Sequence, residues 1–219
     1  MVVRESFQLQ LEEMKKAVIG ISKLTEEALL QSVEALKNQD LDKALEVIEN
    51  DSRINALEDE INDMAILLIA KQAPVASDLR RVIAAIKISS DMERMADFAV
   101  NIAKSTIRIG KQEFVKPLEE LPKMAYLAIE MLTAATKAYE EEEVGRAKEL
   151  ADMDDDVDET YGKIIKELLE LMAKNPDHLS QINQLLFVCR YIERTADHAT
   201  NIAEHIIFLV NGKRHGLND

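Results

Sequence analysis

One charged segment of twelve residues occurs twice in this chain. ERMADFAVNIAK occupies residues 93–104 and ERTADHATNIAE occupies residues 193–204, and eight of the twelve positions are identical. Matches continue upstream at an offset of 103 residues, where Asp51 corresponds to Asp154 and Glu27 to Glu130. The two offsets differ by three residues, and this difference falls in a connector, where changes of length are tolerated. The pattern predicts a duplicated structural unit.

The duplicated unit is expected to be helical. The chain has 6 Gly, 4 Pro and no Trp, and 4% of its residues are aromatic. It therefore has few of the turn-forming residues that a sheet protein needs. Apolar residues recur three and four positions apart, as they do on one face of a helix. These rows predict six long helices, at about residues 5–38, 40–71, 74–109, 121–141, 144–174 and 176–211.

The predicted fold is all-α and consists of two homologous three-helix bundles produced by internal duplication. Residues 1–112 are assigned to the first bundle repeat and residues 113–219 to the second. Long helices joined by short connections pack lengthwise and antiparallel, and the two bundles are expected to lie side by side. Asp40 is expected to cap the second helix, and Pro74 and Pro176 to fall in the first turns of the third and sixth.

The composition limits the partners that the chain can have. Its formal net charge is −14 and its sequence pI is about 4.8, so we expect no nucleic acid partner. The longest purely apolar run, residues 64–70, is far shorter than the roughly 20 residues of a membrane span. The single cysteine, Cys189, lies in an apolar stretch that favours a buried side chain over a reactive thiol. A soluble, cytoplasmic protein is expected.

Polar side chains interrupt the apolar faces at equivalent places in the two units. Residues four positions apart share one face of a helix. The third helix of each unit carries a column of oxygen-bearing side chains with this spacing: Glu93, Asp97 and Asn101 in the first, and Glu193, Asp197 and Asn201 in the second. The second helix of each unit carries a shorter column: Asp51 and Asn55, and Asp154 and Asp158. Where these helices meet, the repulsion between carboxylates must be offset by protonation, by pairing with arginine or by a bound cation.

Three interpretations of these clusters remain open from the residues alone. In the first, Arg94 and Arg194 pair with neighbouring acids in a structural network. In the second, the clusters bind a cation, because oxygen ligands suit Mg²⁺, Ca²⁺, Mn²⁺ or ferric iron, whereas Zn²⁺ ordinarily recruits His or Cys. In the third, paired carboxylates act as general acid and base, although no nucleophile, triad or glycine-rich phosphate loop accompanies them.

Two features argue against other metal chemistry. Di-iron helical bundles use a Glu-x-x-His motif, whereas the spacing here is Glu-x-x-x-Asp. His198 follows Asp197, but its counterpart in the first unit is Phe98, so we interpret His198 as a packed or surface side chain.

At these residues the sequence resembles the PhoU family, the accessory regulators of bacterial phosphate-specific transport. The resemblance covers nearly the whole chain and rests on the doubled ERMAD and ERTAD segments with their trailing Asn-Ile-Ala, the connector PVASDLR at residues 74–80, and the acid pair of each second helix. It implies two three-helix bundles that bind iron clusters or other cations at paired acidic motifs. It also implies a negative regulator of phosphate uptake and of the phosphate-starvation response, and not an enzyme.

The resemblance further implies partners and site residues. The chain would connect the ATPase subunit of the phosphate ABC transporter to a sensor histidine kinase, and would be peripheral to the membrane only through these partners. Its metal residues would be Asp51, Asn55, Glu93 and Asp97 in the first unit and Asp154, Asp158, Glu193 and Asp197 in the second. Asn55 departs from the acid expected there, so the first site has one charge fewer and is expected to bind cations more weakly.

Other expectations complete this interpretation. The metal cation is left open among iron, manganese, magnesium and zinc. A homodimer is expected, because acidic bundles with apolar faces often dimerise. The alternative to an adaptor is a carboxylate-rich metal-storage protein or a metalloenzyme on a helical bundle.

Overall fold

Six long α-helices make up most of the structure, a computed structural model that describes residues 2–213 and 216–217, with side chains from Glu5 onward. They are α1 (Val2–Asn38), α2 (Leu41–Gln72), α3 (Ala76–Ile109), α4 (Glu120–Glu141), α5 (Val144–Lys174) and α6 (Leu179–Asn211), with a 3₁₀ turn, η1 (Pro176–His178), before α6. The described residues contain no strand. The all-α prediction is confirmed.

Side-chain and backbone caps fix the ends of α2. Asp40 caps its start as predicted, because Asp40 Oδ1 accepts a hydrogen bond from the Lys43 N–H at 3.0 Å. At the other end the chain leaves the helix at Ala73, whose backbone is left-handed (φ 44°). The N–H of Ala73 still donates to the Ile69 carbonyl, so the last turn of α2 stays hydrogen-bonded.

The helices predicted to start at Pro74 and Pro176 begin two or three residues later in the structure. Val75 is extended (φ −126°, ψ 160°), so α3 begins after it, at Ala76, and Pro74 lies in the connection. Pro176 opens the 3₁₀ turn η1, and α6 follows from Leu179. Both prolines therefore mark the reversal of the chain between two helices.

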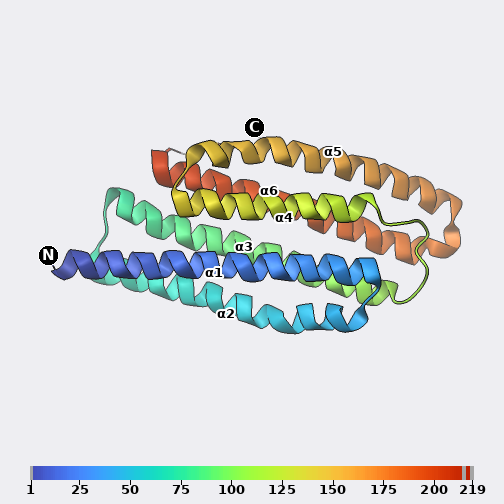
Figure 1. Cartoon of the computed structure of the whole chain (residues 1–219), viewed down its shortest axis with the longest axis horizontal. Helices are drawn as coiled ribbons and strands as arrows, with labels where there is room; N and C mark the ends of the chain where they lie inside the picture. The colour runs from blue at the N-terminus through green and yellow to red at the C-terminus, as the bar shows by residue number, and fades with distance from the viewer. Residues whose placement is uncertain (1, 214–215, 218–219) are drawn as a thin grey trace.

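The helices pack as two three-helix bundles, each formed by one copy of the repeat (Figure 1). In the first bundle α1, α2 and α3 pack against one another, and in the second α4, α5 and α6 do so. The bundles lie side by side through two pairings, α3 with α6 and α1 with α4. These four helices form the middle of the molecule, and α2 and α5 form its flanks. The predicted duplicated fold is confirmed.

Apolar side chains fill the interior of both bundles. Five large methionine side chains are at most 1% exposed: Met14, Met92, Met95, Met124 and Met131. Such flexible thioethers fill irregular gaps between helices. Cys189 is fully buried, and this burial raises the pKa of its thiol to about 12, as expected for an inert core side chain.

This packing positions the acidic columns. Because α2 packs on α3 and α5 packs on α6, the two predicted columns of each half come from neighbouring helices. Among the helices that the structure describes, none is both long and apolar enough to span a bilayer.

Candidate functional site

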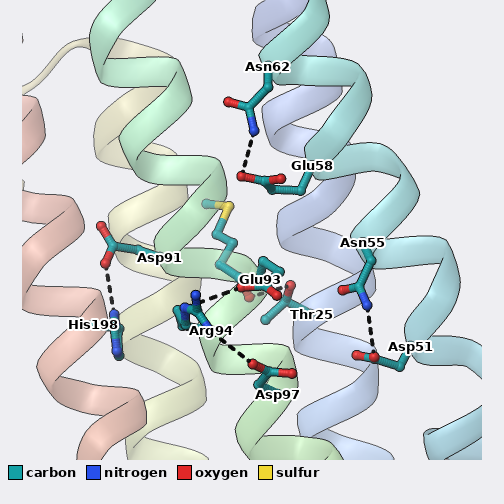
Figure 2. A network of polar contacts seen from close by, with 11 residues as sticks. Thr25, Asp51, Asn55, Glu58, Asn62, Asp91, Glu93, Arg94, Asp97 and His198 are labelled. Carbon is teal, nitrogen blue, oxygen red and sulfur yellow. Dashed lines mark hydrogen bonds and ion pairs between the residues drawn. The ribbon is translucent and has the colours of Figure 1, made fainter.

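The first cluster, defined as Asp51, Asn55, Glu93 and Asp97, joins α2 to α3 and is largely paired within the protein. The Asn55 amide donates to Asp51 Oδ2 at 3.1 Å. Arg94 lies between the two acids of α3, with Nε 3.5 Å from Glu93 Oε2 and Nη1 3.3 Å from Asp97 Oδ2 (Figure 2). The arginine thus partly neutralises both α3 acids, as the structural interpretation predicted for this half.

The acids of α2 and α3 nevertheless influence one another. Burial raises the pKa of Asp51, the bond from Asn55 lowers it, and the charge of Asp97 raises it again from across the helix pair. The pKa of Glu93 is also raised. Burial is the largest cause, and the charge of Asp97 is the largest contribution from neighbouring carboxylates. Asp51 Oδ1 is buried and has no hydrogen-bond partner among the described residues.

The second cluster, defined as Asp154, Asp158, Glu193 and Asp197, joins α5 to α6 at the equivalent position. Asp154 is only 8% exposed, and burial together with the charges of Asp158 and Asp197 raises its pKa to about 6. Burial and the charge of Asp197 also raise the pKa of Asp158 and of Glu193. Glu193 forms an ion pair with Arg190, yet its Oε2 is buried without a hydrogen-bond partner in the described part of the chain.

Three acids of the second cluster lack a cationic partner. Within the described residues, no Lys, Arg or His side chain makes an ion pair with Asp154, Asp158 or Asp197. Arg194, the repeat counterpart of Arg94, instead places its guanidinium 5.5 Å from the centre of the Phe98 ring. The predicted pairing of arginine with neighbouring acids is therefore present at Arg94, whereas Arg194 makes a cation–π contact.

One polar contact between the halves was missed by the sequence analysis. On α3, Asp91 bridges two histidines of α6: its Oδ1 lies 2.8 Å from His198 Nδ1 and its Oδ2 lies 3.1 Å from His205 Nε2 (Figure 2 shows the first pair). Burial raises the pKa of Asp91, but the two histidines outweigh it and lower the pKa overall. The sequence did contain a sign of this contact, because the two repeats differ at this position: the counterpart of Asp91 is Tyr191. In the structure the Tyr191 ring stacks on Phe98, with the ring centres 6.1 Å apart.

The donor chemistry of the clusters fits a hard cation, although the side chains do not converge on one point. Among the described residues, no three His, Cys, Asp or Glu side chains lie close enough together to enclose a metal ion. The unpartnered oxygens of Asp51 and Glu193 and the raised pKa values show acids held near one another without enough positive charge. A cation would therefore have to draw the carboxylates together or be held partly through water.

The chain is similar along its length to proteins of one family. A family model described as "PhoU domain" matches it twice, over residues 18–106 and 121–206. A "Phosphate-specific transport system accessory protein PhoU homolog" from Clostridium acetobutylicum is 36% identical over 219 residues, which is 100% of both chains. A protein of the same description from Zymomonas mobilis is 36% identical over 210 residues, covering 96% of this chain and 89% of that one.

Two solved structures share the fold. The crystal structure of PhoU from Pseudomonas aeruginosa matches with a TM-score of 0.91 at 30% identity, covering 94% of this chain and 100% of that one. The structure of the phosphate transport system regulatory protein PhoU from Streptococcus pneumoniae matches with a TM-score of 0.89 at 30% identity, covering 95% and 99%.

Proposed function

The chain belongs to the PhoU family, and we propose that it is an accessory regulator of phosphate-specific transport that acts as an adaptor. In this role it binds the ATPase subunit of the phosphate ABC transporter and a sensor histidine kinase. It represses phosphate uptake and the phosphate-starvation response when phosphate is plentiful. It works in the cytoplasm as a homodimer, catalyses no reaction, and reaches the membrane only through its partners.

The observation that carries this proposal is similarity over the full length of both chains to a protein described as a phosphate-specific transport accessory protein. The surface of the chain suits protein partners. A formal net charge of −14 favours basic or mixed surfaces over nucleic acid. At the end where α2 turns into α3, the apolar side chains of Ile66 and Val75 are 60% and 74% exposed.

A cation at the carboxylate clusters is the second part of the proposal. Iron, manganese, magnesium or zinc would be held by Asp51, Asn55, Glu93 and Asp97 in the first half and by Asp154, Asp158, Glu193 and Asp197 in the second. When bound, the cation supplies the positive charge that the clusters lack and ties the second helix of each half to the third. The raised pKa values of five of these acids support this part of the proposal.

The adaptor role is tested in the organism that encodes the chain. Deletion of the gene is expected to raise expression of a phosphate-starvation reporter in phosphate-rich medium, and reintroduction of the gene to restore repression. In vitro, the purified chain is expected to bind the purified ATPase subunit and the cytoplasmic part of the kinase with saturation. Unchanged repression in the deletion strain, together with no binding to either partner, would contradict the proposal.

A further inference from the structure

We propose that a cavity between the two bundles binds a small zwitterionic molecule with an apolar body, of the class of the apolar α-amino acids. The cavity has a volume of about 200 Å³ and lies at the end of the molecule where α1 and α3 begin and α4 and α6 end (Figure 1). All four of these helices line it, so a bound molecule contacts both bundles. Neither a partner protein nor a bound cation is needed for this binding, which therefore stands apart from the proposed function.

The size of the cavity suits a small metabolite. Its volume is many times the roughly 15 Å³ that a single water needs, and it is below the range of about 300–1,000 Å³ that is typical of sites for drug-sized ligands.

The wall of the cavity is apolar except for one hydroxyl that has no partner. Leu11 of α1, Leu209 of α6 and Tyr139 of α4 line it, and all three side chains are buried. Tyr139 is only 5% exposed, yet its hydroxyl makes no hydrogen bond to another described residue. Burial raises the pKa of this phenol, and the charges of Glu142 and Glu12 raise it further, so the hydroxyl stays protonated. A buried donor of this kind needs an acceptor, which a ligand can supply.

Two charges of opposite sign lie beside this hydroxyl on α1. Glu12 and Lys15 both line the cavity and are three residues apart, so they share one face of the helix. Lys15 Nζ donates to the Glu140 carbonyl at 2.7 Å, which leaves other N–H groups of the ammonium free. Neither Glu12 nor Lys15 forms an ion pair with another described residue. A ligand carboxylate can therefore bind Lys15, and a ligand ammonium can bind Glu12.

The other two charges that line the cavity neutralise each other. Arg81 binds both carboxylate oxygens of Glu142, at 2.8 and 3.0 Å. The cavity therefore has no excess of either sign. A ligand with a single charge, such as inorganic phosphate, would leave Glu12 or Lys15 without a partner, whereas a zwitterion engages both.

The equivalent place in the other half is closed by the chain itself. The repeat counterpart of Arg81 is Gln181. Gln181 Oε1 accepts from the Val115 N–H at 2.7 Å, and Gln181 Nε2 donates to the Glu113 carbonyl at 3.0 Å, so this side chain binds the connector between α3 and α4. In the first half the residues that correspond to this connector are helical and belong to α1. Arg81 therefore binds a side chain instead of backbone, and the space beside it stays open.

A calorimetric titration of the full chain with matched small molecules tests this assignment. L-leucine, L-methionine and L-phenylalanine carry both charges and an apolar body. The analogues 4-methylpentanoate and 3-methylbutylamine keep the branched body of leucine but each lacks one charged group, and glycine lacks the body. Glu12→Gln, Lys15→Gln and Tyr139→Phe change the cavity. Glu13→Gln and Lys16→Gln are the matched controls, because they make the same charge changes at neighbouring exposed positions of α1.

The expected result is selective for the zwitterion. At least one of the three amino acids binds with about one molecule per chain, and at least about 10-fold more tightly than glycine or either analogue with a single charge. Glu12→Gln and Lys15→Gln weaken this binding by at least about 10-fold, and the control variants change it by less than about 2-fold. Tyr139→Phe keeps the ring and weakens it by about 3-fold or more, because one hydrogen bond is lost. Circular dichroism establishes that each variant is folded.

Three results would overturn the proposal. The first is that none of the three amino acids binds with saturation. The second is that 4-methylpentanoate, 3-methylbutylamine or inorganic phosphate binds as tightly as the best amino acid, since the ligand would then need only one charge. The third is that the control variants weaken binding as much as the cavity variants, which would place the ligand elsewhere. None of these results affects the adaptor role, which is measured with the partner proteins and the deletion strain.

Discussion

The carboxyl group of Asp154 is buried beside other carboxylates, and this changes how stability depends on pH. Burial and the charges of Asp158 and Asp197 raise its pKa from its ordinary value of 3.8 to about 6. Between these values the folded chain keeps a proton that the unfolded chain releases, so the stability contributed by this group is fully present below 3.8 and is lost as the pH rises through about 6. At neutral pH the metal-free protein therefore carries an unfavourable charge at this position.

Replacing Asp154 with Asn is expected to raise the melting temperature of the metal-free protein near neutral pH, because the amide has no charge to desolvate. Near about pH 4 the same substitution is expected to change it little, since Asp154 is then protonated in the fold. Thermal unfolding in chelator-containing buffers from about pH 4 to 8 measures this difference. Asp156→Asn, at an exposed position of α5, serves as the control. An effect of equal size at both ends of the pH range would show that packing, and not charge, is responsible.

At the scale of single residues, the acidic columns could be predicted but their partners could not. A spacing of four fixes which side chains share a helix face, and the duplication identifies the matching helix in the other half. Arg94 and Arg194 occupy equivalent positions, yet Arg94 pairs with acids of its own helix, whereas Arg194 lies over the Phe98 ring, across the packing of α3 on α6. Asp91 was missed because its partner His198 lies 107 residues away on the other bundle.

At the scale of the helices, periodicity predicted all six elements because a packed helix needs one apolar face. The starts next to Pro74 and Pro176 were less accurate. A chain that reverses between two long antiparallel helices needs residues outside both of them, and at the α2–α3 turn these include Ala73, with a left-handed backbone, and Val75, which is extended. Apolar spacing contains no information about these connecting conformations.

The end of α6 provides a prediction at this scale. Gly212 has a left-handed backbone (φ 69°), and a Cβ added there would lie 3.2 Å from Arg80 Nη1. The Arg80 side chain also donates from Nε to the Leu209 carbonyl at 3.0 Å, so it helps to hold this helix end. Gly212→Ala is expected to lower the free energy of unfolding by about 1 kcal/mol, because of backbone strain and displacement of Arg80. Urea unfolding measures the change.

A glycine within α5 is the matched control. Gly162 lies in the interior of the helix, and an added Cβ would meet no atom within 4 Å. Gly162→Ala is therefore expected to raise the free energy of unfolding by about 1 kcal/mol, through helix propensity alone. If both substitutions shifted stability in the same direction, the assignment of a left-handed cap to Gly212 would be wrong.

At the scale of the whole molecule, the sequence predicts two bundles side by side but not which helices meet. The buried face of α3 has the same apolar pattern whichever helix covers it, so the pairing of α3 with α6 and of α1 with α4 emerges only in the fold. Specific polar contacts accompany these pairings. The hydroxyls of Ser22 on α1 and Thr136 on α4 are 2.5 Å apart, and Asp91 on α3 bonds to His198 on α6. We infer that such contacts help to fix the relative position of the bundles.

The contact between Arg81 and Glu142 offers a test of that inference. Arg81 on α3 binds both carboxylate oxygens of Glu142, the cap residue that follows α4 in the other bundle, at 2.8 and 3.0 Å. The bidentate geometry strengthens the coupling energy between the two side chains. Both side chains are about a third exposed, so screening by solvent reduces it. A double-mutant cycle of Arg81→Ala and Glu142→Ala, measured by urea unfolding, is expected to give a coupling of about 1 kcal/mol.

Acid should remove this coupling. The bond from Arg81 lowers the pKa of Glu142 below its ordinary value of 4.5, so the stabilisation is present above 4.5 and is lost as the pH falls through the lowered value. The Lys123–Glu120 pair on α4 is the control, because it lies within one helix and both side chains are more than half exposed, so no measurable coupling is expected there. If the Arg81–Glu142 coupling were no larger than in this control, the bundles would be held at this end by apolar packing alone, and the ion pair would follow from their position without helping to set it.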